Sequence, residues 1–229
     1  MSKLDHEEMS CAVCGMVCSR VVLSSSNEIH PPDFDTRPGE MLRSTLFYWV
    51  MECPGCGYAA PDLREAASGA AGIVRGPEYQ RLRSGGELPA EVRRFACYAF
   101  LLERLELLAD AGWTALHAAW MCDDLNRDEA ARHWRAEAIR LWKLGKARGE
   151  DFMDDHQQEF ALVTDVLRRM GDFDAAREAA LEALALDGLE PLIEDLLRRQ
   201  LVLVQQKDAA AHSMAELERP RPGQRVVLN

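Results

Sequence analysis

Two Cys-x-x-Cys pairs, each followed by glycine, are the residues of this sequence best suited to chemistry. They are Cys11 with Cys14, and Cys53 with Cys56. Two residues between the thiolates let both sulfur atoms of a tight turn point at one ion, and the following glycine lets the backbone fold back toward sulfur. Together the pairs supply the four ligands of a tetrahedral zinc site. Because four thiolates fill every position of the ion, the pattern predicts one structural Zn²⁺ and not a catalytic one.

The interval between the two pairs leaves alternatives open. The 38 residues between Cys14 and Cys53 exceed the usual ribbon spacing, but they contain β-prone runs and prolines that can form the body of a ribbon. Cys18 or His30 can replace a ligand, although the paired turns are complete without them. Two other interpretations of the pairs are reduced cysteines packed as small hydrophobic side chains and a redox dithiol. Cys97 and Cys122 lie in predicted helices, where we expect buried free thiols.

Charge and composition restrict the location and the partners. The net charge is −11, with 27 Lys and Arg against 38 Asp and Glu. This balance argues against a nucleic-acid ligand, because such binding depends on basic side chains that displace counterions. The first ten residues are acidic and polar, unlike a secretory signal, so we expect a reducing, cytoplasmic location. The longest apolar runs, such as residues 46–51, are too short to cross a membrane.

The amino-acid composition of the chain changes near residue 60. Residues 1–60 hold five of the seven cysteines and the β-prone runs 21–23 and 45–51, which predicts a zinc-ribbon-like domain. Residues 61–218 are rich in Ala, Leu, Arg and Glu, which predicts a helical domain. Residues 219–229 contain two prolines and a glycine and are predicted to be a flexible tail. The expected fold is therefore mainly α, with a small N-terminal β zinc-ribbon-like unit followed by a tetratricopeptide-like antiparallel helical array.

Apolar periodicity locates the helices of the second domain. We expect Asp110-Ala111-Gly112 to end the first of the long helices, and Pro61-Asp62 can open a further short one. Short connections make successive helices antiparallel neighbours. The expected helices span residues 92–109, 113–122, 127–144, 157–170, 173–186 and 191–205.

A weak internal repeat with the texture of a tetratricopeptide motif lies within these helices. Phe160 begins one copy, Gly171-Asp172-Phe173 forms its turn, and Ala176, Ala180 and Ala183 occupy the small positions of its second helix. A degenerate earlier copy spans residues 113–138. The alternative is a generic α-helical bundle that shares the turn by chance.

Such a repeat has a concave face on which a peptide can bind. Arg168 and Arg169 are the candidate partner-binding residues, since they can meet an acidic group of an unidentified protein. The competing interpretation, which we favour, is a solvated face beside a helix C-terminus, where positive charge is favourable.

The sequence predicts a non-enzymatic zinc-binding module or scaffold for protein interaction. It contains no glycine-rich phosphate loop, G-x-S-x-G elbow or H-E-x-x-H helix. One alternative is a nucleic-acid-associated zinc-ribbon protein, for which Arg20, Arg37 and Arg43 are the candidate contacts. The other alternative is an enzyme with an unrecognised site, such as thiol chemistry at Cys53 and Cys56.

Two stretches, residues 35–45 (DTRPGEMLRST) and 49–59 (WVMECPGCGYA), resemble a bacterial family known as domain of unknown function 2225. The resemblance covers the first 60 or so residues well and the helical part loosely. It implies that Cys11, Cys14, Cys53 and Cys56 are metal ligands and that tetratricopeptide-like helices follow. It implies no activity. The chain departs from the family pattern at Ala12, where a proline is common, and by carrying the additional Cys18.

Overall fold

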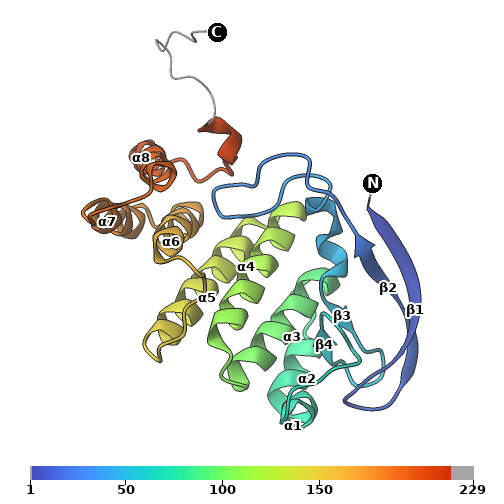
Figure 1. Cartoon of the computed structure of the whole chain (residues 1–229). Coiled ribbons are helices and arrows are strands. Elements are labelled where there is room, and N and C mark those ends of the chain that lie inside the picture. Colours follow the sequence, from blue (N-terminus) through green and yellow to red (C-terminus); the bar gives the residue numbers. More distant parts are fainter. Residues whose placement is uncertain (1, 218–229) are drawn as a thin grey trace. The chain divides into compact units, whose positions relative to one another are not determined.

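In the computed structural model, which describes residues 2–217, the chain divides into two compact units (Figure 1). Unit 1 consists of Met1–Asn27 and Ser44–Asp154, and unit 2 consists of Glu28–Arg43 and Asp155–Asn229. The residues between the two cysteine pairs are therefore divided between the two units, because segment 28–43 packs with the C-terminal helices. The units are defined by packing, so the domain boundary predicted from composition near residue 60 stays a prediction. The predicted tail 219–229 lies outside the described residues.

Two small antiparallel sheets form the N-terminal part of unit 1. Strand β1 (Lys3–Ser10) pairs with β2 (Val17–Ser25), and the turn between them carries the first cysteine pair. Strand β3 (Met51–Glu52) pairs with β4 (Ala59–Ala60), and this turn carries the second cysteine pair. The two turns thus have the same strand–turn–strand setting, and the predicted small β unit is confirmed.

The β-prone run 45–51 is mostly not a strand, and that expectation is wrong. Residues Arg43–Tyr48 form a 3₁₀ helix, η1. Directly after it, the indole Nε1 of Trp49 donates a hydrogen bond of 2.9 Å to the Thr45 hydroxyl, and the Trp49 amide donates to the Leu46 carbonyl at 3.1 Å. Leu46 is 1% exposed. Burial of Leu46 and these local bonds stabilise the short helix against the β propensity of the run.

The three long helices of unit 1 are antiparallel neighbours (Figure 1). The predicted short helix at Pro61 is absent, because residues 61–69 are turns and bends. Pro77 instead occupies the first turn of α2, where its missing N–H costs nothing. The helices are α1 (Ala70–Arg75), α2 (Pro77–Ser84), α3 (Ala90–Arg104), α4 (Leu108–Asp124) and α5 (Asp128–Lys146).

Gly112 does not end a helix as predicted but lies inside α4. A Cβ atom at this position would lie 2.3 Å from the indole ring of Trp142 on α5. The glycine therefore permits a close approach of two helices. The chain reverses earlier, at Glu106, which has a φ of 61°.

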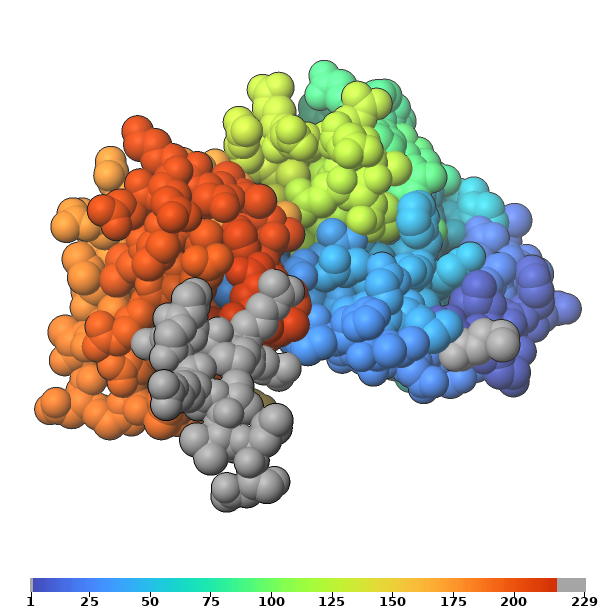
Figure 2. All heavy atoms as spheres, turned by 90° about the horizontal axis from the view of Figure 1, so that it is seen from above, coloured from blue at the N-terminus to red at the C-terminus, as the bar shows by residue number. Residues whose placement is uncertain are grey.

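Unit 2 contains three mutually packed helices, α6 (His156–Met170), α7 (Phe173–Leu184) and α8 (Pro191–Gln205). A short 3₁₀ helix, η2 (Met214–Glu216), follows them. Segment 28–43 joins this cluster through Phe34, whose amide bonds to the His212 carbonyl at 2.8 Å. Figure 2 shows atoms of this segment, in blue, against the last described residues, in red. The core includes Phe34, Ala161, Ala180, Ala183, Ile193, Leu196, Leu197 and Leu203.

The turn between α6 and α7 has the features that the repeat hypothesis required. Gly171 adopts φ +90° at the C-cap of α6, and the Asp172 carboxylate accepts a 3.1 Å hydrogen bond from the Ala175 amide. The mainly helical fold with a small N-terminal sheet is thus confirmed, whereas the type of repeat stays a prediction. No helix in the described part of the chain is long and apolar enough to span a membrane.

Candidate metal centre

The two turns bring the four predicted cysteine ligands together. All four sulfur atoms lie within 4.8 Å of one another. The Cys11 and Cys56 sulfurs are 3.8 Å apart, and those of Cys14 and Cys53 are 3.6 Å apart. Tetrahedral Zn²⁺ with Zn–S bonds of about 2.3 Å requires sulfur–sulfur distances of about 3.8 Å. The cluster, called here the cysteine tetrad, is therefore positioned to bind a metal ion and fits zinc.

The same backbone hydrogen bonds build both turns. In the first turn, the Cys11 amide donates to the Met16 carbonyl at 2.9 Å and the Gly15 amide donates to the Cys11 carbonyl at 2.7 Å. In the second turn, the Cys53 amide donates to Tyr58 at 2.8 Å and the Gly57 amide donates to Cys53 at 2.9 Å.

Both glycines of these turns have positive φ, +74° at Gly15 and +81° at Gly57. This conformation is costly for residues with a Cβ atom. The predicted role of the glycine after each pair is thereby confirmed.

Side chains from α2 hold the second turn from outside, and one from α1 holds the first. The Tyr79 hydroxyl donates to the Gly57 carbonyl at 2.8 Å and accepts from the Ala59 amide at 3.1 Å. Gln80 donates to the Cys56 carbonyl at 3.1 Å. Arg75 reaches the first turn, with 3.3 Å to the Val13 carbonyl. Sequence reasoning missed these residues, because they lie in a stretch whose apolar periodicity is too weak to predict a helix.

Because the tetrad is partly buried, its thiolate forms require a nearby positive charge. Cys11 and Cys53 are 1% and 0% exposed. Desolvation raises the pKa of both Cys11 and Cys56 above the ordinary thiol value. The exposed Cys14 differs, because a hydrogen bond from the Met16 amide lowers its pKa to about 7. A bound divalent cation favours the thiolate form of all four groups and compensates for the desolvation of the buried ones.

The other cysteines lie outside the tetrad. Cys18 is in β2, opposite Met9, and is partly exposed. Cys97 and Cys122 are 2% and 0% exposed, and burial raises the pKa of each to about 12. They are buried free thiols, as predicted. His30 belongs to unit 2 and is not a member of the tetrad.

Arg168 and Arg169 are buried rather than exposed, at 0% and 8%. Arg168 donates to the Asp165 carboxylate at 2.7 Å and to the Asp208 carbonyl at 2.6 Å. Arg169 donates to the Asp35 carboxylate at 2.6 Å. Both the peptide groove and the solvated face are therefore wrong for this pair. The sequence at the end of α6 predicts exposed arginines, because only one of their partners, Asp165, is a neighbour in sequence. The other partners, Asp35 and Asp208, lie far away along the chain.

Of the three arginines proposed for nucleic-acid contact, two serve unit 2 itself. Arg37 is 5% exposed, and Arg43 makes an ion pair of 2.6 Å with Asp33. Arg20 lies in β2 of unit 1, where its guanidinium bonds to backbone carbonyls. The three do not share one compact unit.

The fold and the site together define a class, a mainly helical protein with a tetracysteine metal centre in its N-terminal part. Comparison of the chain with protein-family models, curated proteins and solved structures finds no match.

Proposed function

We propose that the protein binds one structural Zn²⁺ through Cys11, Cys14, Cys53 and Cys56. The observation that carries this proposal is the close spacing of the four sulfur atoms, with one short contact from each cysteine of the first turn to a cysteine of the second. The ion would cross-link the β1–β2 hairpin to the β3–β4 turn. The resemblance to domain of unknown function 2225 supports the same ligand set.

The proposed ion has a structural role, because four thiolates occupy its coordination sphere and no position is left for a substrate or water. The metal centre is therefore proposed to act in a non-enzymatic module. Free thiolates persist as metal ligands in a reducing compartment, which supports a cytoplasmic location.

The helical part is proposed to bind a protein partner, as stacked helix pairs commonly do. Support comes from the α6–α7 pair, with its glycine turn, its aspartate cap and the buried Ala176, Ala180 and Ala183. The buried Arg168 and Arg169 have no part in this surface.

Metal content of the purified protein tests the zinc proposal. We expect one zinc per chain, and loss of zinc in Cys56→Ser because one of four ligands is removed. Cys18→Ser is the matched control, since Cys18 is a partly exposed thiol near the first turn but outside the tetrad. Cobalt(II) reconstitution should give an absorption spectrum typical of tetrahedral thiolate coordination.

Hydrogen exchange after treatment with a chelator locates the structural effect. Amides of β1 and β2 should exchange faster, while those of α6–α8 keep their protection. Retention of zinc by Cys56→Ser, loss of zinc from Cys18→Ser, or a chelator effect confined to α6–α8 would each contradict the proposal.

A further inference from the structure

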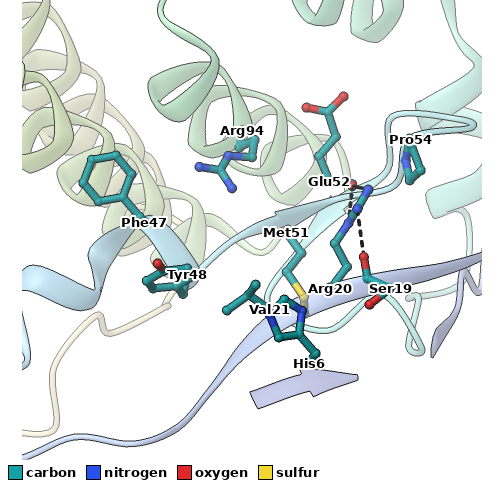
Figure 3. A pocket seen from close by; sticks show the side chains of 10 residues that line it. All are labelled: His6, Ser19, Arg20, Val21, Phe47, Tyr48, Met51, Glu52, Pro54 and Arg94. Carbon is teal, nitrogen blue, oxygen red and sulfur yellow. Dashed lines mark hydrogen bonds between the residues drawn. The ribbon is translucent and has the colours of Figure 1, made fainter. Parts of the chain in front are cut away.

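A pocket of about 790 Å³ lies in unit 1 beside the second cysteine turn, with walls from β1, β2, β3, η1 and α3 (Figure 3). Its volume is within the range of about 300–1,000 Å³ found for small-molecule sites. It is called here the arginine pocket, and its lining residues are His6, Ser19, Arg20, Val21, Phe47, Tyr48, Met51, Glu52, Pro54 and Arg94.

Two guanidinium groups in this pocket are anchored without being neutralised. Arg20 donates to the Glu52 carbonyl at 2.8 Å and to the Ser19 carbonyl at 3.1 Å. Arg94 donates to the Val50 carbonyl at 3.3 Å. Within the described residues, neither forms an ion pair with a carboxylate. Backbone carbonyls orient a guanidinium but leave its charge uncompensated.

The one acidic residue of the lining is already engaged. The Glu52 carboxylate accepts a hydrogen bond of 3.0 Å from Arg83. Figure 3 shows it pointing away from Arg20. The arginine pocket is therefore locally positive in a chain whose net charge is −11.

Electrostatics at Arg94 agrees with this geometry. Burial lowers the pKa of Arg94, the carboxylates of Glu91 and Glu52 oppose that effect, and the charge of Arg20 lowers the pKa further. The charge of Arg20 thus acts on Arg94, although less strongly than those of Glu91 and Glu52. An anion between them would offset the effect of Arg20 and use N–H donors of Arg94, which makes one side-chain hydrogen bond in the described part of the chain.

An aromatic wall stands beside these charges. Phe47, 38% exposed, and Tyr48 line the pocket from η1. Figure 3 shows the Arg94 guanidinium directed toward the space beside these rings. Exposed aromatic faces next to arginines suit a ligand that carries a planar ring and a negative group.

We propose that the arginine pocket binds a small phosphate ester with an aromatic ring, such as a nucleoside monophosphate. Arg20 and Arg94 hold the phosphate, and Phe47 and Tyr48 pack against the ring. Guanidinium groups match phosphate oxygens through paired N–H donors, which favours a phosphate dianion between two arginines.

Calorimetric titration of the zinc-loaded full chain with AMP and with phenyl phosphate tests this site. Adenosine and inorganic phosphate are the comparison ligands, since each lacks one half of the proposed recognition. We expect saturable binding of the phosphate esters, with an affinity that falls as salt is added. Adenosine and inorganic phosphate should bind at least about tenfold more weakly than the esters.

Arg94→Gln should weaken AMP binding about tenfold or more, because a charge-assisted hydrogen bond is lost. Arg104→Gln is the matched control, as Arg104 lies on the same helix but is exposed and paired with Glu78 at 2.7 Å. Phe47→Ala should weaken AMP while leaving inorganic phosphate unchanged. If Arg94→Gln does not fold, Arg20→Gln on β2 serves the same purpose.

Several outcomes would overturn the proposal. They are no saturable binding of either phosphate ester, equal binding of AMP and adenosine, and equal losses in Arg94→Gln and Arg104→Gln. Zinc content is measured in every variant, so that damage to the metal centre is distinguished from loss of the ligand.

Discussion

The two units fix their segments of little helical structure by different interactions. In unit 1 the two cysteine turns converge on one point, where four sulfur atoms lie within 4.8 Å. In unit 2, segment 28–43 is held by buried charges, with Asp35 fully buried and 2.6 Å from Arg169 on α6.

The difference between these anchors is one of kind. A structural zinc site contributes about 10 kcal/mol or more to folding and acts only when the ion is present. A buried ion pair has a small net value, because desolvation offsets the attraction, yet removal of one partner is costly. Unit 1 should therefore depend on metal supply, and unit 2 should depend on the completeness of its charge pairs.

Removal of one buried charge gives the largest expected effect within unit 2. Asp35→Ala leaves the Arg169 guanidinium buried without its 2.6 Å partner. We expect a loss of about 3–5 kcal/mol in the stability of unit 2. Urea unfolding followed by circular dichroism should show an earlier helical transition. All five tryptophans lie in unit 1, so tryptophan fluorescence should change little.

Glu194→Ala is the control for this substitution. Glu194 pairs with Arg198 on the exposed face of α8, where both side chains are well solvated. The expected cost is below about 1 kcal/mol. Equal effects of Asp35→Ala and Glu194→Ala, or loss of zinc from Asp35→Ala, would break the distinction between the two anchors.

Acidification should act in opposite directions through His117 of unit 1 and Asp165 of unit 2. In unit 1, burial of His117 among aromatic rings, including Trp120 at 4.8 Å, lowers its pKa from 6.5 to about 4. The unfolded chain then binds this proton first, so unit 1 loses about 3 kcal/mol between pH 6.5 and 4. In unit 2, burial raises the pKa of Asp165 from 3.8 to about 6. The folded state binds that proton first, so this group stabilises unit 2 as the pH falls through 6 toward 4.

Urea titrations at several pH values separate these contributions, with fluorescence reporting on unit 1 and circular dichroism on all helices. His117→Phe is the control, because phenylalanine keeps the aromatic contacts and does not titrate. Acid release of zinc also weakens unit 1, but it acts equally on the variant and the parent. A fluorescence midpoint that falls equally with pH in both proteins would exclude His117 as the cause.

Features built by neighbours in sequence were predicted better than features that depend on residues far apart in the chain. Helix α8 spans the predicted residues 191–205, because Pro191 opens it and apolar residues repeat along it. The cysteine tetrad was predictable for the same reason, since each turn is built by neighbours in sequence. Segment 28–43 was expected to belong to the ribbon, because nothing within it records that Phe34 packs against α6–α8.

The prediction for Arg168 was wrong for a related reason. Basic residues at a helix end are favourable in water, so the pattern cannot distinguish exposed arginines from buried ones. The burial depends partly on the Asp208 carbonyl, 40 positions away. Partner residues at such distances leave no periodic signal.

Gly112→Ala gives the smallest expected effect and tests how unit 1 packs where metal is not involved. The new Cβ would lie 2.3 Å from the Trp142 ring. Overpacking costs about 1–3 kcal/mol, partly offset by a gain of up to about 1 kcal/mol in helix propensity. Gly72→Ala in α1 is the matched control, because nothing lies within 4 Å of its Cβ, and it should stabilise slightly. Urea unfolding followed by fluorescence measures both variants. Midpoint shifts of the same sign would mean that Trp142 yields at no cost and that close packing at Gly112 does not hold α4 and α5 together.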